Sequence, residues 1–401
     1  MINTVIANSD AVKRNNRSLV LKKIFLSEAI NRKQIANDLK ITPATVTNIT
    51  NFLIKNKLVN EEGYIEEVRS GPRARILQIT HDKYCICAVH IGVNILKLGV
   101  TTLKGEILDY VHFNMTSWTK DEIAKKIIDF VNAKKENTSS KIIGVGMCIS
   151  GSVSYEQQKI ISAMRADFDW FPLAKTIENA TGISTWMDGL MTSMGSEYLL
   201  FSTNASLSNS IIIYDGGFLG MTAIYGIDVL RGAHNMFGAL GKTSESLEKD
   251  ICIPAILKGK MHLSTADLAL SETEQDEKTY TENVRQLWRM NIEKSKLSNK
   301  SIAKSAVNKR VNRYTELLLL LTAIFDPNTI YIKSIYSCNS FCDDIQAIIG
   351  LYNKKMLAHS QAFPKIEFEE LEPGFSVRSG AAIVIKELLN MNTKFDFLWS
   401  E

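Results

Sequence analysis

From residue 84 onward, short apolar runs alternate with glycine turns, and this pattern constrains the fold more than any other feature of the sequence. It predicts three strands, a helix and a fourth strand, at 84–90, 95–101, 107–113, about 120–132 and 141–149. A similar series begins at Ser210, where an apolar run leads through a glycine-rich turn into a second run at 221–224. The repeated order predicts two related α/β lobes with a cleft between them.

The first 80 residues have a different pattern, which is typical of short helices. Apolar residues recur at helical spacing over 16–30 and again over 32–39. Thr42 can cap a third helix, and Pro43 suits its first position because the N–H that proline lacks has no partner there. In this third helix, from 43 to about 55, apolar residues line one face and small polar residues line the other.

Two short helices joined by a tight turn, the second with a polar outer face, are typical of a helix-turn-helix. A hairpin predicted at 64–68 and 74–80 would form a wing beside it. Small side chains let a helix enter the major groove, and asparagine can pair with adenine through two hydrogen bonds. The side chains expected to read base edges or to hold phosphates are Arg32, Lys33, Thr42, Ala44, Thr45, Thr47, Asn48, Asn51, Arg73 and Arg75.

The distribution of charge favours the same interpretation. Residues 1–80 contain 13 Lys and Arg against 7 Asp and Glu, whereas the remaining residues contain 34 against 36. A basic segment ahead of a slightly acidic body suggests that the first part binds a polyanion such as double-stranded DNA. Glu61, Glu62, Glu66 and Glu67 would then have to point away from the DNA. The alternative is a small three-helix domain that docks a protein.

Short motifs along nearly the whole chain carry a family resemblance. They include Ile35-Ala36-Asn37-Asp38-Leu39, Thr45-Val46-Thr47-Asn48-Ile49, Ser70-Gly71-Pro72-Arg73, Ala88-Val89-His90-Ile91-Gly92, Trp186-Met187-Asp188, Leu230-Arg231-Gly232-Ala233 and Asp326-Pro327-Asn328-Thr329-Ile330. In this order and spacing, the chain resembles the transcriptional regulators of the ROK family (repressors, open reading frames and sugar kinases). The resemblance implies an α/β fold, in which an N-terminal winged helix-turn-helix is followed by a two-lobed actin-like (ribonuclease-H-like) body. It also implies a repressor of carbohydrate-related genes with a degenerate sugar-kinase-like body.

The resemblance also shows which parts of a ROK kinase are altered. His90-Ile91-Gly92-Val93-Asn94 stands where these kinases have an Asp-Ile-Gly-Gly-Thr loop, whose glycines let backbone N–H groups reach nucleotide phosphates. The second phosphate turn, 217–220, is kept only in part. Asp188 falls where the family has its catalytic base and could act as a general base. We expect no catalytic residue and no cofactor. A sugar kinase with an added domain and a non-enzymatic protein-interaction regulator are the alternatives.

The zinc site of the family is also incomplete. Its members usually carry a Glu-Ile-Gly-His segment followed by three cysteines, whereas this chain has Ala239-Leu240-Gly241-Lys242 and then only Cys252. One cysteine without the histidine cannot close a tetrahedral site, so we expect no bound metal. Cys85 and Cys87 share one face of a strand, and we expect them to be core thiols.

The resemblance implies that the body keeps part of an effector site. Arg165, Asp167, Asp188 and His234 could hydrogen-bond a sugar or a sugar derivative. An equally simple interpretation makes Arg165 and Asp167 a surface turn, Asp188 a helix cap and His234 an exposed loop residue. The body would then bind an unusual effector, respond to a protein partner or only dimerise.

These inferences give an expected organisation of the whole chain. Residues 1–80 would form the winged helix-turn-helix, 81–200 the first lobe, completed by a C-terminal helix at 378–401, and 201–377 the second lobe.

No apolar stretch approaches the ~18–20 residues that span a bilayer. With six scattered cysteines, the sequence favours a cytoplasmic protein without a disulfide framework. A homodimer or homotetramer would bind an inverted-repeat operator.

Overall fold

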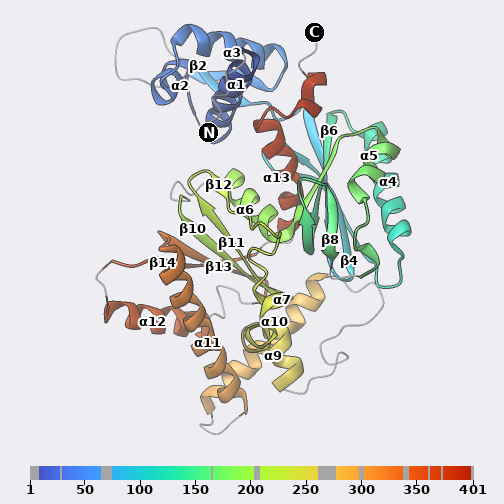
Figure 1. The fold of residues 1–401 in the computed structure, drawn as a ribbon. Coiled ribbons are helices and arrows are strands. Elements are labelled where there is room, and N and C mark those ends of the chain that lie inside the picture. The colour runs from blue at the N-terminus through green and yellow to red at the C-terminus, as the bar shows by residue number, and fades with distance from the viewer. Residues whose placement is uncertain are drawn as a thin grey trace, which may run out of the picture. The chain divides into compact units, whose positions relative to one another are not determined.

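The computed structural model shows a chain of helices and mixed sheets (Figure 1). It describes residues 9–27, 29–64, 75–163, 166–202, 208–260, 277–297, 302–336, 343–359, 362–371 and 374–398. The contacts divide the chain into two compact units. Unit 1 comprises residues 1–112, 117–188 and 377–401, and unit 2 comprises 113–116 and 189–376.

Unit 1 begins with three helices and a hairpin. They are α1 (Ser9–Phe25), α2 (Arg32–Leu39), α3 (Pro43–Lys55), β1 (Val59–Tyr64) and β2 (Arg75–Ile79). The second and third helices have the predicted bounds. The first helix does not: it runs from Ser9 to Phe25, whereas the sequence predicted 16–30. Ile30 pairs with Leu77 of β2 instead, and Asn31 caps α2, so the chain must leave the helix before these residues.

Local capping explains why α2 and α3 begin where they do. The Asn31 side chain accepts a hydrogen bond from the Gln34 N–H while the Gln34 side chain accepts one from the Asn31 N–H. Thr42 caps α3, and Pro43 occupies its first position. In the hairpin, the first strand starts at Val59, earlier than the sequence predicted, and Gly63 lies at a bulge with φ +64°.

A five-stranded sheet follows in unit 1. Its strands are β3 (Tyr84–Ile91), β4 (Ile95–Thr102), β5 (Ile107–Asn114), β6 (Lys141–Ile149) and β9 (Thr185–Gly189), in the order β5-β4-β3-β6-β9. Strand β3 is antiparallel to β4 and parallel to β6. The remaining elements are α4 (Lys120–Asn137), the hairpin β7 (Gly151–Ser154) and β8 (Lys159–Ala163), η1 (Ala166–Phe168), α5 (Leu173–Thr181), α13 (Phe375–Leu389) and η2 (Thr393–Leu398).

Unit 2 repeats this sheet. Its strands are β10 (Ser210–Asp215), β11 (Leu219–Tyr225), β12 (Asp228–Val229), β13 (Thr329–Ser334) and β14 (Lys365–Glu370), in the order β12-β11-β10-β13-β14. Its helices are α6 (Leu190–Phe201), α7 (Leu240–Thr243), α8 (Glu245–Ile251), α9 (Ile253–Lys260), α10 (Glu277–Leu297), α11 (Ile302–Phe325) and α12 (Asp343–Leu357). The same strand order in both units is the related pair of α/β lobes that the sequence predicted.

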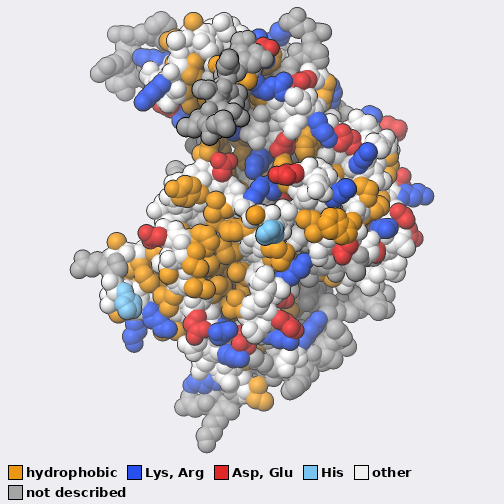
Figure 2. All heavy atoms as spheres, in the orientation of Figure 1, with side chains coloured by type: hydrophobic (Ala, Val, Ile, Leu, Met, Phe, Trp, Pro, Cys, Tyr) orange, Lys and Arg blue, Asp and Glu red, His pale blue; other side chains and the backbone are white. Residues whose placement is uncertain are grey.

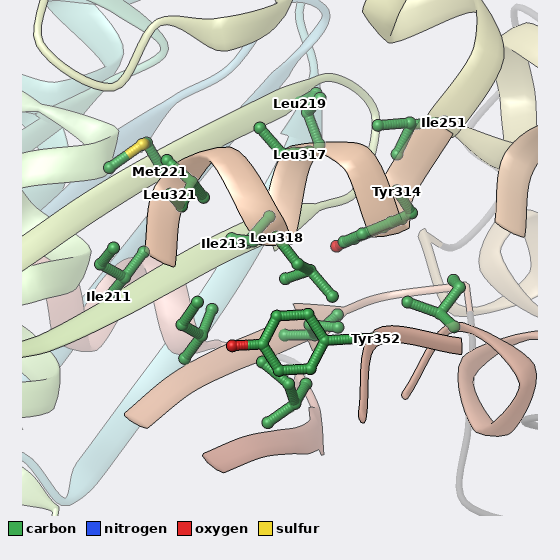
Figure 3. Close-up of a cluster of buried hydrophobic side chains, with 14 of the residues drawn as sticks. Ile211, Ile213, Leu219, Met221, Ile251, Tyr314, Leu317, Leu318, Leu321 and Tyr352 are labelled. Atoms are coloured by element: carbon green, nitrogen blue, oxygen red, sulfur yellow. The ribbon is translucent and has the colours of Figure 1, made fainter. Parts of the chain in front are cut away.

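The core of unit 2 lies between its sheet and the helix α11. Leu317, Leu318 and Leu321 of α11 pack with Ile211 and Ile213 of β10 in one buried cluster (Figure 3). These apolar residues are buried to 5% exposure or less, so their removal from water stabilises the lobe. Among the described residues, none of the helices is both long enough and apolar enough to cross a membrane.

In unit 1, the helix α13 approaches the sheet unusually closely. A Cβ atom on Gly146 of β6 would lie 2.0 Å from the carbonyl oxygen of Gly380, and one on Gly99 of β4 would lie 2.7 Å from Val377. A Cβ atom on Gly380 would in turn meet the backbone of Val89 at 3.0 Å. Glycines on both sides therefore let α13 rest on the sheet backbone.

Gly146→Ala tests this close approach. The methyl group has no space beside the Gly380 carbonyl, and overpacking a core typically costs ~1–3 kcal/mol. We expect the free energy of unfolding to fall by about 2 kcal/mol or more in urea titrations. Gly217→Ala is the matched control, because a Cβ atom there would meet nothing within 4 Å. Equal stability of the two variants would contradict the packing described here.

Candidate functional site

The exposed face of α3 carries most of the residues that the sequence predicted to contact DNA. Val46, Ile49 and Leu53 are buried on the opposite face. Thr42, Ala44, Thr47, Asn48 and Asn51 are exposed, and Thr45 is half-buried. The helix α3 therefore presents a small, polar surface on one side, while its other side is packed into a core.

Two hydroxyl groups on this face are held by local hydrogen bonds. Thr42 Oγ1 accepts from the Thr45 N–H at 3.3 Å, which is the cap of α3. Thr47 Oγ1 donates to the carbonyl oxygen of Pro43 at 2.8 Å. The Thr47 hydroxyl oxygen keeps acceptor capacity on the exposed surface, because its proton points back into the helix.

Arg32 makes internal contacts that the sequence did not predict. Its Nε donates to Thr50 Oγ1 at 2.8 Å, its Nη2 donates to Asn51 Oδ1 at 3.3 Å, and its Nη1 pairs with Glu61. The second carboxylate oxygen of Glu61 lies 3.4 Å from Arg75 on β2. Arg32 thus joins α2, α3 and the hairpin, and it orients Asn51 in addition to any contact with phosphate.

Glu61 is the residue of this network that sequence reasoning missed. Its partner Arg32 is 29 positions away, and no local pattern brings the two together. Lys33 is exposed on α2 and Arg75 is exposed on β2. Arg73 lies outside the described residues, as do Glu66 and Glu67.

The first altered phosphate loop lies in the β3–β4 turn of unit 1. The Gly92 N–H donates to the Ile95 carbonyl at 2.9 Å, within the turn. His90 is buried with its Nε2 3.2 Å from Ser150 Oγ, and the buried Lys97 stands opposite it across the strands. Burial, with the nearby charge of Lys97, lowers the pKa of His90 from 6.5 to about 3. A neutral imidazole therefore stands where ROK kinases have an aspartate.

The second altered phosphate turn lies between β10 and β11 of unit 2. The Leu219 N–H in this turn bonds to the Glu248 carboxylate, whose pKa is raised by burial and lowered in part by this bond. The Glu248 carboxylate lies where a side chain at Gly241 would be, 1.7 Å from the position of its Cβ atom. A carboxylate of the chain itself thus occupies a backbone N–H of this turn.

A buried cluster of charges closes the same end of β10. Asp215 Oδ2 lies 2.7 Å from Arg310 Nη2, and Arg310 Nε lies 2.9 Å from Asp344 Oδ2. All three side chains are buried. Arg310 also bonds to the Ile251 carbonyl. Buried charges need paired partners, and these three side chains provide them for one another inside the lobe.

The predicted effector residues are spread over both units. Asp188 is buried at the end of β9, one residue before the chain passes into unit 2. Asp167 is exposed in η1 of unit 1, and His234 is exposed in a turn of unit 2. Arg165 lies outside the described residues. Their grouping into one effector site stays a prediction.

The cysteines within the described residues are buried. Cys85, Cys87 and Cys252 are buried free thiols, and burial raises the pKa of Cys85 to about 11. The Ala239–Lys242 stretch runs into the short helix α7. Within the described ranges, no three His, Cys, Asp or Glu side chains are grouped so that they could hold a metal ion.

Comparison with known proteins decides the family. The model of the ROK family matches residues 86–386. The chain belongs to the ROK family. A xylose repressor of Caldicellulosiruptor bescii is 22% identical over 96% of this chain and 99% of that protein. A xylose repressor of Staphylococcus xylosus is 22% identical over 95% and 97%. The transcriptional regulator NagC of Escherichia coli is 21% identical over 52% of each chain.

Solved structures of ROK proteins share the fold. A ROK family transcriptional regulator, described as a homologue of the Escherichia coli Mlc protein, matches with a TM-score of 0.71 at 18% identity. It covers 94% of this chain and 97% of its own. A ROK hexokinase of Thermus thermophilus matches with a TM-score of 0.57 at 16% identity, covering 76% and 99%. The match with the regulator therefore extends over more of this chain than the match with the kinase.

His90→Gln is expected to reduce the acid sensitivity of this ROK protein. The imidazole takes up a proton near pH 6.5 in the unfolded chain but only near pH 3 in the folded chain. Between these values the unfolded state binds more protons, so stability falls as the pH falls. From pH 7 to pH 5, the wild type should lose about 2 kcal/mol more than the variant.

Urea unfolding at both pH values measures this difference. His234→Gln is the control, because this histidine is exposed and should leave the pH dependence of the wild type in place. An equal loss of stability in wild type and His90→Gln would show that His90 is not buried in its neutral form.

Proposed function

We propose that this ROK protein is a DNA-binding transcriptional repressor of sugar-related genes, and that residues 1–80 form a winged helix-turn-helix. The observation that carries the proposal is the exposed polar face of α3, which presents Ala44, Thr47, Asn48 and Asn51 while the opposite face is buried. The relatives named as repressors extend over nearly the whole chain. The regulator structure supports the same assignment, since it covers 94% of the chain.

The Arg32 network suggests how the two asparagines divide the reading of bases. An arginine only donates hydrogen bonds, so the Asn51 atom that faces it is the carbonyl oxygen. The Asn51 amide group is then best placed to donate to guanine N7 or O6 or to thymine O4. Asn48 is exposed and can make the two-bond contact with adenine. Lys33, Arg73 and Arg75 would contact phosphates or the minor groove.

Asn48→Ala combined with Asn51→Ala tests this function. We expect specific affinity for DNA upstream of the regulated genes to fall at least about 30-fold in gel shifts, because each good base contact contributes ~1–3 kcal/mol of discrimination. Binding to unrelated DNA should change little, since phosphate contacts dominate it. Thermal unfolding should be nearly unchanged because both side chains are exposed.

Asn15→Ala is the matched control, an exposed asparagine on α1. It should bind the specific DNA like the wild type. Unchanged specific affinity in the double variant would contradict the proposed reading of bases by α3.

The body is proposed to be a regulatory module without kinase activity. In the first loop a neutral His90 replaces the acidic residue, and in the second turn Glu248 occupies a backbone donor. Arg310 pairs with both Asp215 and Asp344 inside the lobe. A nucleotide would have to displace these internal contacts in order to bind.

The kinase alternative has a direct test. Incubation with ATP, magnesium and a panel of sugars should give no ADP above the rate of a blank. ADP release that disappears in Asp188→Asn would establish the sugar kinase instead, since Asp188 lies at the position of the family's catalytic base.

Unit 2 offers a surface for the proposed homodimer. Exposed apolar side chains lie on the β11–β12 hairpin (Tyr225 and Ile227) and near the end of α11 (Leu320 and Ile324). Figure 2 shows hydrophobic side chains gathered on this unit, over the strands β10 and β11. Large exposed apolar patches usually mark binding surfaces. A second copy bound here would give the dimer two recognition helices for an inverted repeat. Asp167 and Asp188 of unit 1 would contribute to a sugar effector site.

A further inference from the structure

The first helix of unit 1 is fastened to the C-terminal end of α13. Ser18 Oγ on α1 donates to the carbonyl oxygen of Leu389 at 2.7 Å, and this hydrogen bond is buried. Arg14 donates to the carbonyl oxygen of Met391 at 2.9 Å and lies 3.4 Å from Asp396. The last carbonyl groups of a helix have no partner within the helix, so Ser18 supplies a donor that the end of α13 requires, and Arg14 binds the turn that follows.

A second contact holds the C-terminal end of α1. Lys104, in the turn between β4 and β5, donates from Nζ to the carbonyl oxygen of Phe25 at 2.9 Å. The same ammonium lies 4.7 Å from the centre of the Phe25 ring. Burial lowers the pKa of Lys104. A positive charge at the C-terminal end of a helix is stabilising, which favours this position.

A third contact reaches the proposed recognition helix itself. The Tyr84 hydroxyl, at the start of β3, donates to the carbonyl oxygen of Asn56 at 2.9 Å. Asn56 is the residue that ends α3. Burial raises the pKa of Tyr84, so the phenol stays protonated and remains a donor.

Together these contacts tie the helical domain to the lobe at three separate places. The lobe provides the carbonyl groups of α13, the ammonium of Lys104 and the hydroxyl of Tyr84. Three separated points fix the orientation of one rigid body on another. The helix α13 is itself seated on the sheet through Gly380, so it provides a firm support for α1.

We propose that Arg14, Ser18 and Tyr84 are positioning residues that fix the recognition helix on its lobe and thereby restrict the spacing between operator half-sites. This inference rests on the proposed DNA-binding function. In a homodimer, the distance between two recognition helices follows from how each is held on its own lobe. A helical domain released from its lobe would still read a half-site but would tolerate other spacings.

The experiment compares the full-length wild type with the variant Arg14→Ala, Ser18→Ala and Tyr84→Phe. Both bind a DNA sequence that the wild type selects from a random pool, and the same sequence with five base pairs inserted between the half-sites. The wild type should lose at least about 30-fold in affinity on insertion, because half a helical turn places the second half-site on the other side of the DNA. The variant should lose less than about fivefold, and both should bind a single half-site equally.

Lys13→Ala is the matched control, because it removes the same charge from an exposed position of α1. It should discriminate between spacings like the wild type. Equal discrimination by the triple variant and the wild type would overturn the inference, as would a wild type that tolerates the insertion. If the triple variant fails to bind the half-site, Tyr84→Phe alone decides: a relaxed spacing supports the inference and an unchanged spacing overturns it.

The outcomes separate this inference from the function on which it rests. A wild type that selects no DNA sequence would contradict the DNA-binding function. A wild type that selects a sequence, with variants that respond to spacing in the same way, would contradict only the role of the positioning residues.

Discussion

The close approach of α13 to the first sheet is the constraint on which the arrangement of unit 1 depends. The Gly380 carbonyl lies where any side chain at Gly146 would begin, so this part of the helix rests on backbone. The last residue of α13 presents the Leu389 carbonyl to Ser18, and the turn after the helix presents the Met391 carbonyl to Arg14. The position of the helical domain therefore depends on Gly146 and Gly380, where the sheet and α13 meet backbone to backbone. A displacement of α13 on the sheet would therefore displace the helical domain as well.

Unit 2 shows how a kinase-like fold can keep its architecture while its phosphate turn is satisfied internally. Glu248 accepts a hydrogen bond from the Leu219 N–H, and Arg310 pairs with Asp215 at the end of β10. These contacts link the turn to α8 and the end of β10 to α11. The fold shared with a ROK hexokinase therefore does not by itself imply its chemistry.

Local signals predicted much of this structure. The caps at Asn31 and Thr42 and the apolar periodicity determine α2 and α3, and alternating apolar runs and turns gave the repeated sheets. The contacts that position the candidate site could not be predicted in this way. Arg32 and Glu61 are 29 positions apart, and Ser18 and Leu389 are 371 apart. Only the folded chain brings such pairs together, because their side chains follow no spacing rule.

We propose that α3 reads DNA as part of a symmetric pair. The most direct measurement is sequencing of the DNA that the full-length protein recovers from a random pool, repeated with a chain in which α3 carries alanine at Asn48 and Asn51. If α3 reads DNA in this way, we expect enrichment of inverted repeats whose half-sites lie a whole number of helical turns apart. We expect this enrichment to be lost in the altered chain. Recovery of no common sequence, or of the same sequence by both chains, would contradict it.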